Sequence, residues 1–464
     1  MKKVFGLFLS LMVLMSLSAC EPETPGNPRK PEPDESSYLT FVSSGKSTIA
    51  LTKEGEPFEI TLEYSVDGEV WDPYTIGETV ELADGGELMF RAGEDGNDRF
   101  SAGYADYYRF VISGKVDSKG NVMSLLDRDC KADSVPEAGF IYLFANCDGL
   151  MSTPVLPAKS LAPGCYLAMF AGCTNLTEAP ALPAMELAAG CYSSMFNGCM
   201  GLTEAPALPA MELAAGCYSS MFNGCMGLTE APELPAMKLV PNCYANMFTY
   251  CTSLTETPAL PATELAMMCY YCMFLGCTNL TKAPALPAME MAASCYLGLF
   301  SDCTSLTEAP ALPATELAQW CYKSMFDGCT SLMTAPALPA TELAGSCYSV
   351  MFFGCTNLTK APELPATELT EWCYSGMFSG CTSLTKAPAL PATELAESCY
   401  SNMFYGCVSL NYVKALFTDG PSDGTTYCWL FDVSPTGTFV KSKDATWDVR
   451  GSNGIPEGWT VVIE

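Results

Sequence analysis

The chain has 464 residues, with 23 Lys and Arg against 52 Asp and Glu and a formal net charge of −29. So acidic a surface repels nucleic acid and anionic lipid headgroups, and we expect no nucleic-acid partner. The charge either favours cationic partners or only keeps a long surface soluble. The sequence contains no histidine, so a Ser-His-Asp or Cys-His catalytic arrangement cannot form, and we expect a protein that is not an enzyme.

The first residues predict export from the cell. Residues 1–19 combine Lys2 and Lys3 with an apolar run, as a signal peptide does, and end in Leu-Ser-Ala before Cys20. This ending resembles a bacterial lipobox, which implies that Cys20 carries a lipid anchor. The alternative is a plain secretory signal with a chance cysteine. No second long apolar run follows, so we expect the N-terminal lipid to be the only attachment to a membrane.

The next segment, residues 20–36, is rich in Pro and Glu and contains no aromatic or branched aliphatic residue after Cys20. Such a composition cannot bury a core, so we expect a disordered, extended tether. An acidic stretch directly after a lipidated cysteine resembles the export signal of Bacteroidetes-type surface lipoproteins. The resemblance implies a protein of the outer membrane that is exposed at the cell surface.

Residues 37–130 alternate apolar and polar side chains in short runs, for example over 58–64 and 108–112. Asp-Gly pairs separate the runs, which predicts a small antiparallel β-sandwich with tight hairpin turns. Such a domain is either a glycan-binding module, with Trp71 and Tyr74 as candidate stacking residues, or a spacer that caps the next domain.

A 26-residue unit then repeats from about Gly139 to Leu410, inside a solenoid that we expect over residues 131–410. Its consensus is C-Y-x-x-M-F-x-G-C-T-S-L-T-x-A-P-A-L-P-A-T-E-L-A-x-x. A strict period of this length predicts supersecondary units that stack to bury one continuous core. A degenerate first copy at Gly139 brings the expected number to about eleven coils, or a rod of about 50 Å at the spacing of parallel strands.

Within a coil, Met and Phe fall four and five residues after the first Cys, which favours one or two turns of helix. The segment T-S-L-T-x-A-P then favours a strand, with Thr177, Ala179 and Ala181 pointing inward and Glu178 and Pro180 outward. Proline cannot donate to a ladder, so the strand should be very short, and T-E-L-A should begin the next helix. The expected fold is therefore an α+β repeat solenoid with a short strand and a short helix in each coil.

The element M-F-x-G-C-T-S-L-T, as in Met377 to Thr385, resembles the BspA-like leucine-rich-repeat family of bacterial surface proteins. The resemblance covers about 60% of the chain. The chain departs from the family's commonest form in having A-P-x-L-P in place of an uninterrupted apolar strand. The resemblance implies a surface-exposed adhesion or recognition protein that meets molecules of a host or a neighbouring cell.

The repeat carries two columns of cysteines, from Cys165 to Cys399 and from Cys147 to Cys407. The spacing C-x7-C and the lack of histidine exclude a zinc site, and we expect neither metal nor cofactor. Disulfides within a coil are one remaining interpretation, because the chain is exported. We favour buried free thiols that pack as small apolar groups, since the family resemblance places these positions in the core.

Function should lie where the repeat varies. One candidate is the column between Thr and Ala-Pro, which either contacts a partner or is a solvated row free to drift. A second is a pair of tryptophans beside the first Cys, which either contacts a protein or sugar or folds over a neighbouring coil. The candidate residues are Glu178, Glu204, Glu230, Glu256, Lys282, Glu308, Thr334, Lys360 and Lys386 in the column, and Trp320 and Trp372.

Residues 411–464 lose the proline motif, and we expect a β-rich C-terminal cap in which Trp429, Trp447 and Trp459 supply bulk. The sequence therefore predicts a lipid-anchored surface protein that binds an extracellular protein partner through its repeats. Two alternatives stay open: a glycan-binding accessory of nutrient capture, and a structural protein of the envelope.

Overall fold

The computed structural model describes residues 37–56 and 58–464, and all of them belong to one folded unit. The expected signal peptide over 1–19, the lipidated Cys20 and the tether over 20–36 lie outside the described residues. Within the described residues, no helix is long and apolar enough to cross a bilayer.

Two antiparallel sheets form the N-terminal part, with strand orders β4-β3-β6-β1-β8 and β5-β2-β7. Apolar side chains of both sheets meet in a common core, where the ring centroids of Phe41 and Phe110 lie 5.0 Å apart and those of Phe90 and Phe110 lie 5.4 Å apart. The alternating sequence pattern thus produces a packed sandwich. The strands are β1 (Leu39–Ser43), β2 (Ser47–Glu54), β3 (Leu62–Ser65), β4 (Asp72–Pro73), β5 (Thr79–Leu82), β6 (Glu87–Ala92), β7 (Tyr107–Ser113) and β8 (Val116–Lys119).

The sandwich lies directly on the first coil of the repeat. The backbone amide of Phe110 in β7 donates to the carbonyl of Leu143 at 2.8 Å, and that of Val116 donates to Gly149 at 2.9 Å. The Phe110 and Phe144 rings stack with their centroids 5.3 Å apart. The sandwich therefore covers the apolar end of the coils, as a solenoid requires at its terminus.

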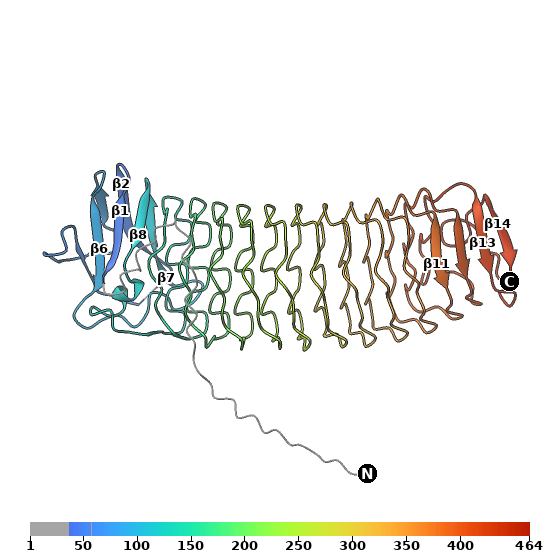
Figure 1. The fold of residues 1–464 in the computed structure, drawn as a ribbon, viewed down its shortest axis with the longest axis horizontal. Helices are drawn as coiled ribbons and strands as arrows, with labels where there is room; N and C mark the ends of the chain where they lie inside the picture. Colours follow the sequence, from blue (N-terminus) through green and yellow to red (C-terminus); the bar gives the residue numbers. More distant parts are fainter. Residues whose placement is uncertain (1–36, 57) are drawn as a thin grey trace, which may run out of the picture. The chain divides into compact units, whose positions relative to one another are not determined.

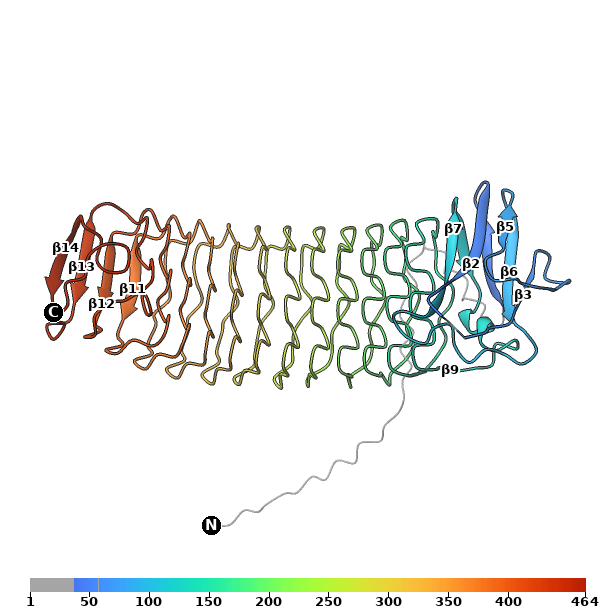
Figure 2. The ribbon, with the colours of Figure 1, turned by 180° about the vertical axis from the view of Figure 1, so that it is seen from behind.

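The repeat itself is a β-solenoid of about 13 turns, and only about 1% of the residues that the structure describes are helical. Figures 1 and 2 show the coils following one another between the sandwich and strands β11 to β14. The predicted α+β fold with a helix in each coil is wrong, and so is the expected number of eleven coils. Among the described residues, the one helix is the 3₁₀ helix η1 (Val122–Leu125), which precedes the repeat.

Backbone dihedral angles explain why the C-Y-x-x-M-F segment is not helical. Every fourth residue there has a positive φ, as at Gly164 (62°), Ala168 (50°) and Gly172 (75°). Right-handed helices exclude such residues, and their periodic recurrence bends the chain instead into consecutive tight turns. The glycine before the second Cys therefore belongs to this series of turns and does not mark the end of a helix.

The hydrogen bonds of this segment alternate between its own coil and the next. Met169 donates from its amide to the carbonyl of Tyr166, three residues back, at 3.2 Å. The following amide, that of Phe170, donates to Met195 in the next coil at 2.9 Å. Half of the amides in this segment therefore bond to the next coil, and these bonds join the turns of neighbouring coils. The backbone N–H and C=O groups find partners without a helix or a continuous strand.

Two columns of aromatic rings fill the core. The tyrosines from Tyr166 to Tyr400 stack with centroids 5.8–6.1 Å apart. The phenylalanines from Phe144 to Phe404 stack at 5.3–5.9 Å. Both columns of cysteines are buried beside them as free thiols, in agreement with the favoured interpretation of the sequence. The columns explain why these four positions vary so little.

The proline-containing segment also differs from the prediction. Pro180 and Leu182 are buried, whereas Thr177 and Ala181 are exposed; only Glu178 points outward as expected. Because Thr177 and Glu178 are both exposed, the alternation is shifted by one position after them. The ring of Pro180 packs inward as an apolar group, and its nitrogen has no N–H to donate to a ladder. Neighbouring coils therefore meet here mainly through isolated parallel bridges. The short pair β9 (Ser134–Val135) and β10 (Ser160–Leu161) opens the series.

At the C-terminal end the coils continue as a parallel sheet of β11 (Lys386–Leu390), β12 (Tyr412–Ala415), β13 (Gly437–Lys441) and β14 (Trp459–Ile463). Beyond β11 the strands contain no proline, so their amides can form a regular ladder. Trp429, Trp447 and Trp459 are buried, and their indole N–H groups donate to backbone carbonyls at 2.9, 3.2 and 2.8 Å. Their bulk closes the apolar end of the coils.

Candidate functional site

One outward side of the solenoid is a regular surface built from the T-x-A-P-x-L-P segments, and we name it the ladder face. In the coil that contains Glu178, its exposed residues are Thr177, Glu178, Ala181 and Pro183. Successive coils repeat this row in register because the backbone segments are parallel. Since Ala and Pro are short, the charged side chains stand out above an otherwise flat apolar surface.

The candidate column lies along this face, and all nine of its residues are exposed. Parallel bridges join Glu178 to Glu204, Glu204 to Glu230 and Thr334 to Lys360. Neighbours are therefore separated by about one strand spacing, roughly 4.8 Å. The column is acidic through its first four members and carries lysine at two of its last three, so the ladder face has a direction along its length.

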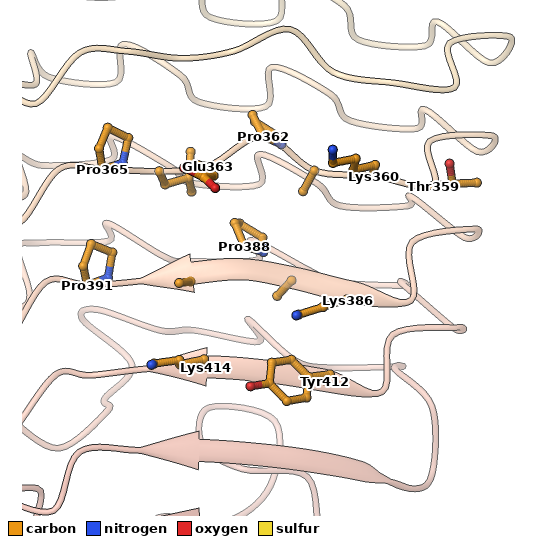
Figure 3. Close-up of a pocket in the computed structure, with 14 residues that line it drawn as sticks. Thr359, Lys360, Pro362, Glu363, Pro365, Lys386, Pro388, Pro391, Tyr412 and Lys414 are labelled. Carbon is orange, nitrogen blue, oxygen red and sulfur yellow. The ribbon is translucent and has the colours of Figure 1, made fainter. Parts of the chain in front are cut away.

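At the C-terminal end of the ladder face, three neighbouring coils enclose a groove of about 710 Å³. Figure 3 shows that it runs from the segment around Lys360 across β11 to β12, with prolines on two coils facing lysines and a tyrosine. Its side chains include Thr359, Lys360, Pro362, Glu363, Pro365, Lys386, Pro388, Pro391, Tyr412 and Lys414.

The groove is locally basic in a strongly acidic chain. The ammonium of Lys386 lies 4.8 Å from the centroid of the Tyr412 ring, a cation–π distance. Lys414 is paired with Glu464 at 2.6 Å. Lys360 is exposed and makes no ion pair within the described part of the chain. Two lysines are therefore available to an incoming anion, with the Glu363 carboxylate beside them.

The shape of the groove follows from its prolines. A proline cannot donate to a neighbouring strand, so adjacent A-P-x-L-P segments separate and leave a furrow between them. A smaller furrow of about 340 Å³ lies between the segments of Pro180 and Pro206 near the other end of the ladder face. The C-terminal groove is larger, and it ends at the Tyr412 side chain. The ladder face thus offers apolar furrows bounded by charged side chains.

The side chains of the groove can bind a ligand through charge and through apolar contact. In residues 37–56 and 58–464, no group of three or more His, Cys, Asp or Glu side chains is arranged to hold a metal ion. Lysine ammonium groups can pair with carboxylates, and proline and tyrosine can pack against an apolar segment. The groove therefore suits an extended chain that carries acidic groups.

Sequence reasoning found Lys360 and Lys386 but missed Tyr412 and Lys414. The signal was present, because Tyr412 follows Lys386 by one 26-residue period and pairs with it in the register of β11 and β12. The prediction ended the repeat at Leu410 and did not carry the period across that boundary. The remaining column members, from Glu178 to Thr334, lie outside the groove.

The two candidate tryptophans also lie outside the groove, at the turn before the first Cys of their coils. Trp320 is 39% exposed and Trp372 is 44% exposed, so neither is folded away under a neighbouring coil. Both have positive φ, 60° and 58°. An exposed indole in this conformation is unusual.

The two candidate stacking residues of the sandwich do not form an open platform. Tyr74 is buried, and its hydroxyl accepts from the amide of Leu51 at 2.8 Å. The guanidinium of Arg91 lies 3.9 Å from the centroid of the Trp71 ring, and Arg91 is itself paired with Glu63 at 2.7 Å. Both side chains thus serve the internal packing of the sandwich, which removes them as a sugar-binding pair.

No protein-family model matches the chain, and no curated protein is significantly similar to it. Three chains of solved structures match it, and one belongs to the crystal structure of a TLR13-ssRNA13 complex. That match has 12% sequence identity, a TM-score of 0.26, and covers 68% of this chain and 47% of that chain. The likeness to this leucine-rich-repeat protein is weak, and the match spans less than half of that protein's length.

Proposed function

We propose that the protein is a non-enzymatic recognition protein that binds an extracellular protein partner through its ladder face, with the C-terminal groove as the anchor. The observation that carries the proposal is the groove itself. Lys360, Lys386 and Tyr412 gather there between proline walls, in a chain whose net charge is −29.

The form of the surface favours a protein as the ligand. A specific protein interface covers about 800 Å² on each partner, which a groove alone does not supply but a long flat face does. The Ala and Pro rows would contact apolar side chains of the partner, and the lysines would pair with its carboxylates. Because the column changes from acidic to basic, opposite charges on the partner would fix its orientation.

We further propose that the chain is a lipoprotein of the outer membrane, exposed at the cell surface. The lipobox-like end of residues 1–19, Cys20 and the resemblance of the repeat to the BspA-like family support this location. Proteinase K digestion of intact cells, with a periplasmic protein as the control, tests it. We expect the solenoid to be lost while the control survives; protection until lysis would contradict surface exposure and favour a structural protein of the envelope.

The binding proposal is tested with arrays of purified extracellular proteins, glycans and single-stranded RNA, probed with the full-length protein and two variants. Lys360→Glu with Lys386→Glu reverses the charge of the groove. Lys53→Glu makes the same kind of change at an exposed lysine of strand β2, away from the ladder face, so it is the control. We expect protein ligands that the double variant loses and the control keeps, and no signal from RNA.

Two results would overturn this proposal. Equal binding by the wild type and both variants would remove the groove as the anchor. Binding to glycans without any protein ligand would favour the accessory role in nutrient capture.

A further inference from the structure

A second site is indicated by a conflict between residue type and backbone conformation. The residue before the first Cys of each coil has positive φ in ten successive coils. Most of these positions hold glycine, asparagine or serine, which tolerate that region better than a bulky side chain does. Trp320 and Trp372 are the exceptions with the largest side chains. Burial of the indole does not offset the cost of the positive φ at either residue, because both side chains are exposed. The residues are Gly164, Gly190, Gly216, Asn242, Met268, Ser294, Trp320, Ser346, Trp372 and Ser398.

The coil between the two tryptophans carries no large side chain at the equivalent positions. It carries Gly345 and Ser346 at the equivalent positions, and a Cβ atom added to Gly345 would lie 3.5 Å from the carboxylate of Glu371 and 3.7 Å from the amide nitrogen of Gln319. The two polar side chains thus converge on the space above a glycine. We name this place the notch: Gln319, Trp320, Gly345, Ser346, Glu371 and Trp372.

The surroundings of the notch are anionic. Six glutamates stand in the four coil segments around it, and the chain carries no Lys or Arg between Lys323 and Lys360. None of the six forms an ion pair within the described part of the chain. They are Glu316, Glu342, Glu368, Glu371, Glu394 and Glu397.

We propose that the notch binds the guanidinium group of an arginine side chain on a protein partner. A guanidinium is planar, so it can stack on an indole face, and it can donate two parallel hydrogen bonds to the Glu371 carboxylate. The amide nitrogen of Gln319 faces Gly345, so the amide must rotate for its oxygen to accept a further N–H. Two coil spacings, about 10 Å, separate the tryptophans, and Glu371 directly precedes Trp372 in the chain. The notch shares no residue with the groove and does not depend on it.

Titration of the full-length protein with N-acetyl-arginine amide, followed by tryptophan fluorescence, tests the proposal. The neutral isostere N-acetyl-citrulline amide and N-acetyl-lysine amide are the comparison ligands. We expect a saturable change with arginine and binding weaker by about fivefold or more with citrulline and with lysine. Equal binding of citrulline would overturn recognition of charge, and equal binding of lysine would overturn recognition of the planar group.

Two variants locate the site. Glu371→Gln should weaken arginine binding by about fivefold or more, because it removes the charged acceptor. Glu308→Gln removes an exposed carboxylate on the ladder face and should leave binding unchanged. If both variants bind arginine as the wild type does, Glu371 is not its acceptor and the proposal fails.

The stability of the Trp320→Ser and Trp372→Ser double variant separates binding from packing. Serine already occupies this position with positive φ at Ser294, Ser346 and Ser398. If the tryptophans are kept for a ligand, the double variant should lose the arginine response and unfold at the same or a higher temperature than the wild type. A lower unfolding temperature would show that the tryptophans are kept for packing and would overturn the proposal.

Discussion

The thiol of Cys251 donates a hydrogen bond to the backbone carbonyl of Phe222, in the preceding coil, at 3.1 Å. The same contact, at 3.0–3.2 Å, recurs along the second cysteine column from Cys147 to Cys407. Each of these cysteines therefore fills space and also gives a buried carbonyl a second donor, beside a backbone amide such as that of Cys225, which donates to Phe222 at 3.0 Å. A serine would bring a stronger donor on a shorter arm, and an alanine would bring none.

The first prediction concerns the state of these thiols. Because the column cysteines are buried and free, we expect them not to react with Ellman's reagent in the native protein at neutral pH, and to react without reductant once the protein is denatured. Cys130 and Cys428 are partly exposed and should react first. Few reactive thiols in the denatured, unreduced protein would mean that the columns are oxidised to disulfides.

The second prediction concerns the energy of the contact. Cys251→Ala removes one of the two donors to the Phe222 carbonyl, which still accepts from the amide of Cys225 at 3.0 Å, and it opens a small cavity. It should therefore reduce the free energy of unfolding by about 1–3 kcal/mol, mainly through the cavity. Cys130→Ala is the control at a partly exposed position and should change it by about 0.5 kcal/mol or less. Guanidinium-induced unfolding followed by circular dichroism measures both, and equal effects would deny the buried contact a role in stability.

The third prediction concerns pH. Burial raises the pKa of Cys225 and Cys277 to about 12, from an ordinary value of 9.0, and it raises the pKa of Tyr166 and Tyr400 well above the ordinary value. Below pH 9 the thiols are protonated in both the folded and the unfolded chain, so their contribution to stability is constant. Above pH 9 the unfolded chain loses protons that the folded chain retains, and stability falls.

The effect should be steep because the same buried groups recur in every coil. We expect the protein to lose its circular dichroism signal cooperatively between pH 9 and about 12 and to tolerate neutral pH. The mid-point of guanidinium unfolding, measured from pH 7 to pH 11, should fall once the pH exceeds 9. A mid-point that stays constant over that range would contradict the burial of the thiols.

The period of the sequence was sufficient to predict the solenoid and its columns of core residues. It was not sufficient to predict the backbone of the coil. Met and Phe at four and five residues after Cys suit a helix, but Gly164, Ala168 and Gly172 have positive φ at a spacing of four. Glycine at all three of these positions would have indicated the positive φ from the sequence. Alanine, serine and valine, which occupy the second of the three positions in several coils, give no such indication. Stacking of identical coils enforces the conformation there, and a single coil's residues do not encode it.

The candidate site was likewise predicted only in part from the sequence. The exposed column was identified from its variation, and the structure places Lys360 and Lys386 side by side in the groove. The walls were not predicted, because inward packing of Pro180 and its equivalents reverses the alternation on which the outward residues were chosen. The shape of a furrow depends on the distance between the proline-containing segments of two coils. The sequence pattern of one segment does not give that distance.

The last prediction tests whether the positive φ values are imposed by stacking. Val350 is the second of the three positive-φ residues of its coil and has φ of 49°. Asn246 and Asn402 occupy the same place in their own coils and have φ of 55°. A β-branched side chain is poorly suited to this region, and asparagine is among the better ones. Val350→Asn should therefore raise the free energy of unfolding by about 1 kcal/mol. Val350→Ile keeps the branch and should give no gain. Guanidinium unfolding of the wild type and both variants makes the comparison, and a loss of stability in Val350→Asn would mean that the valine's contacts outweigh its strain.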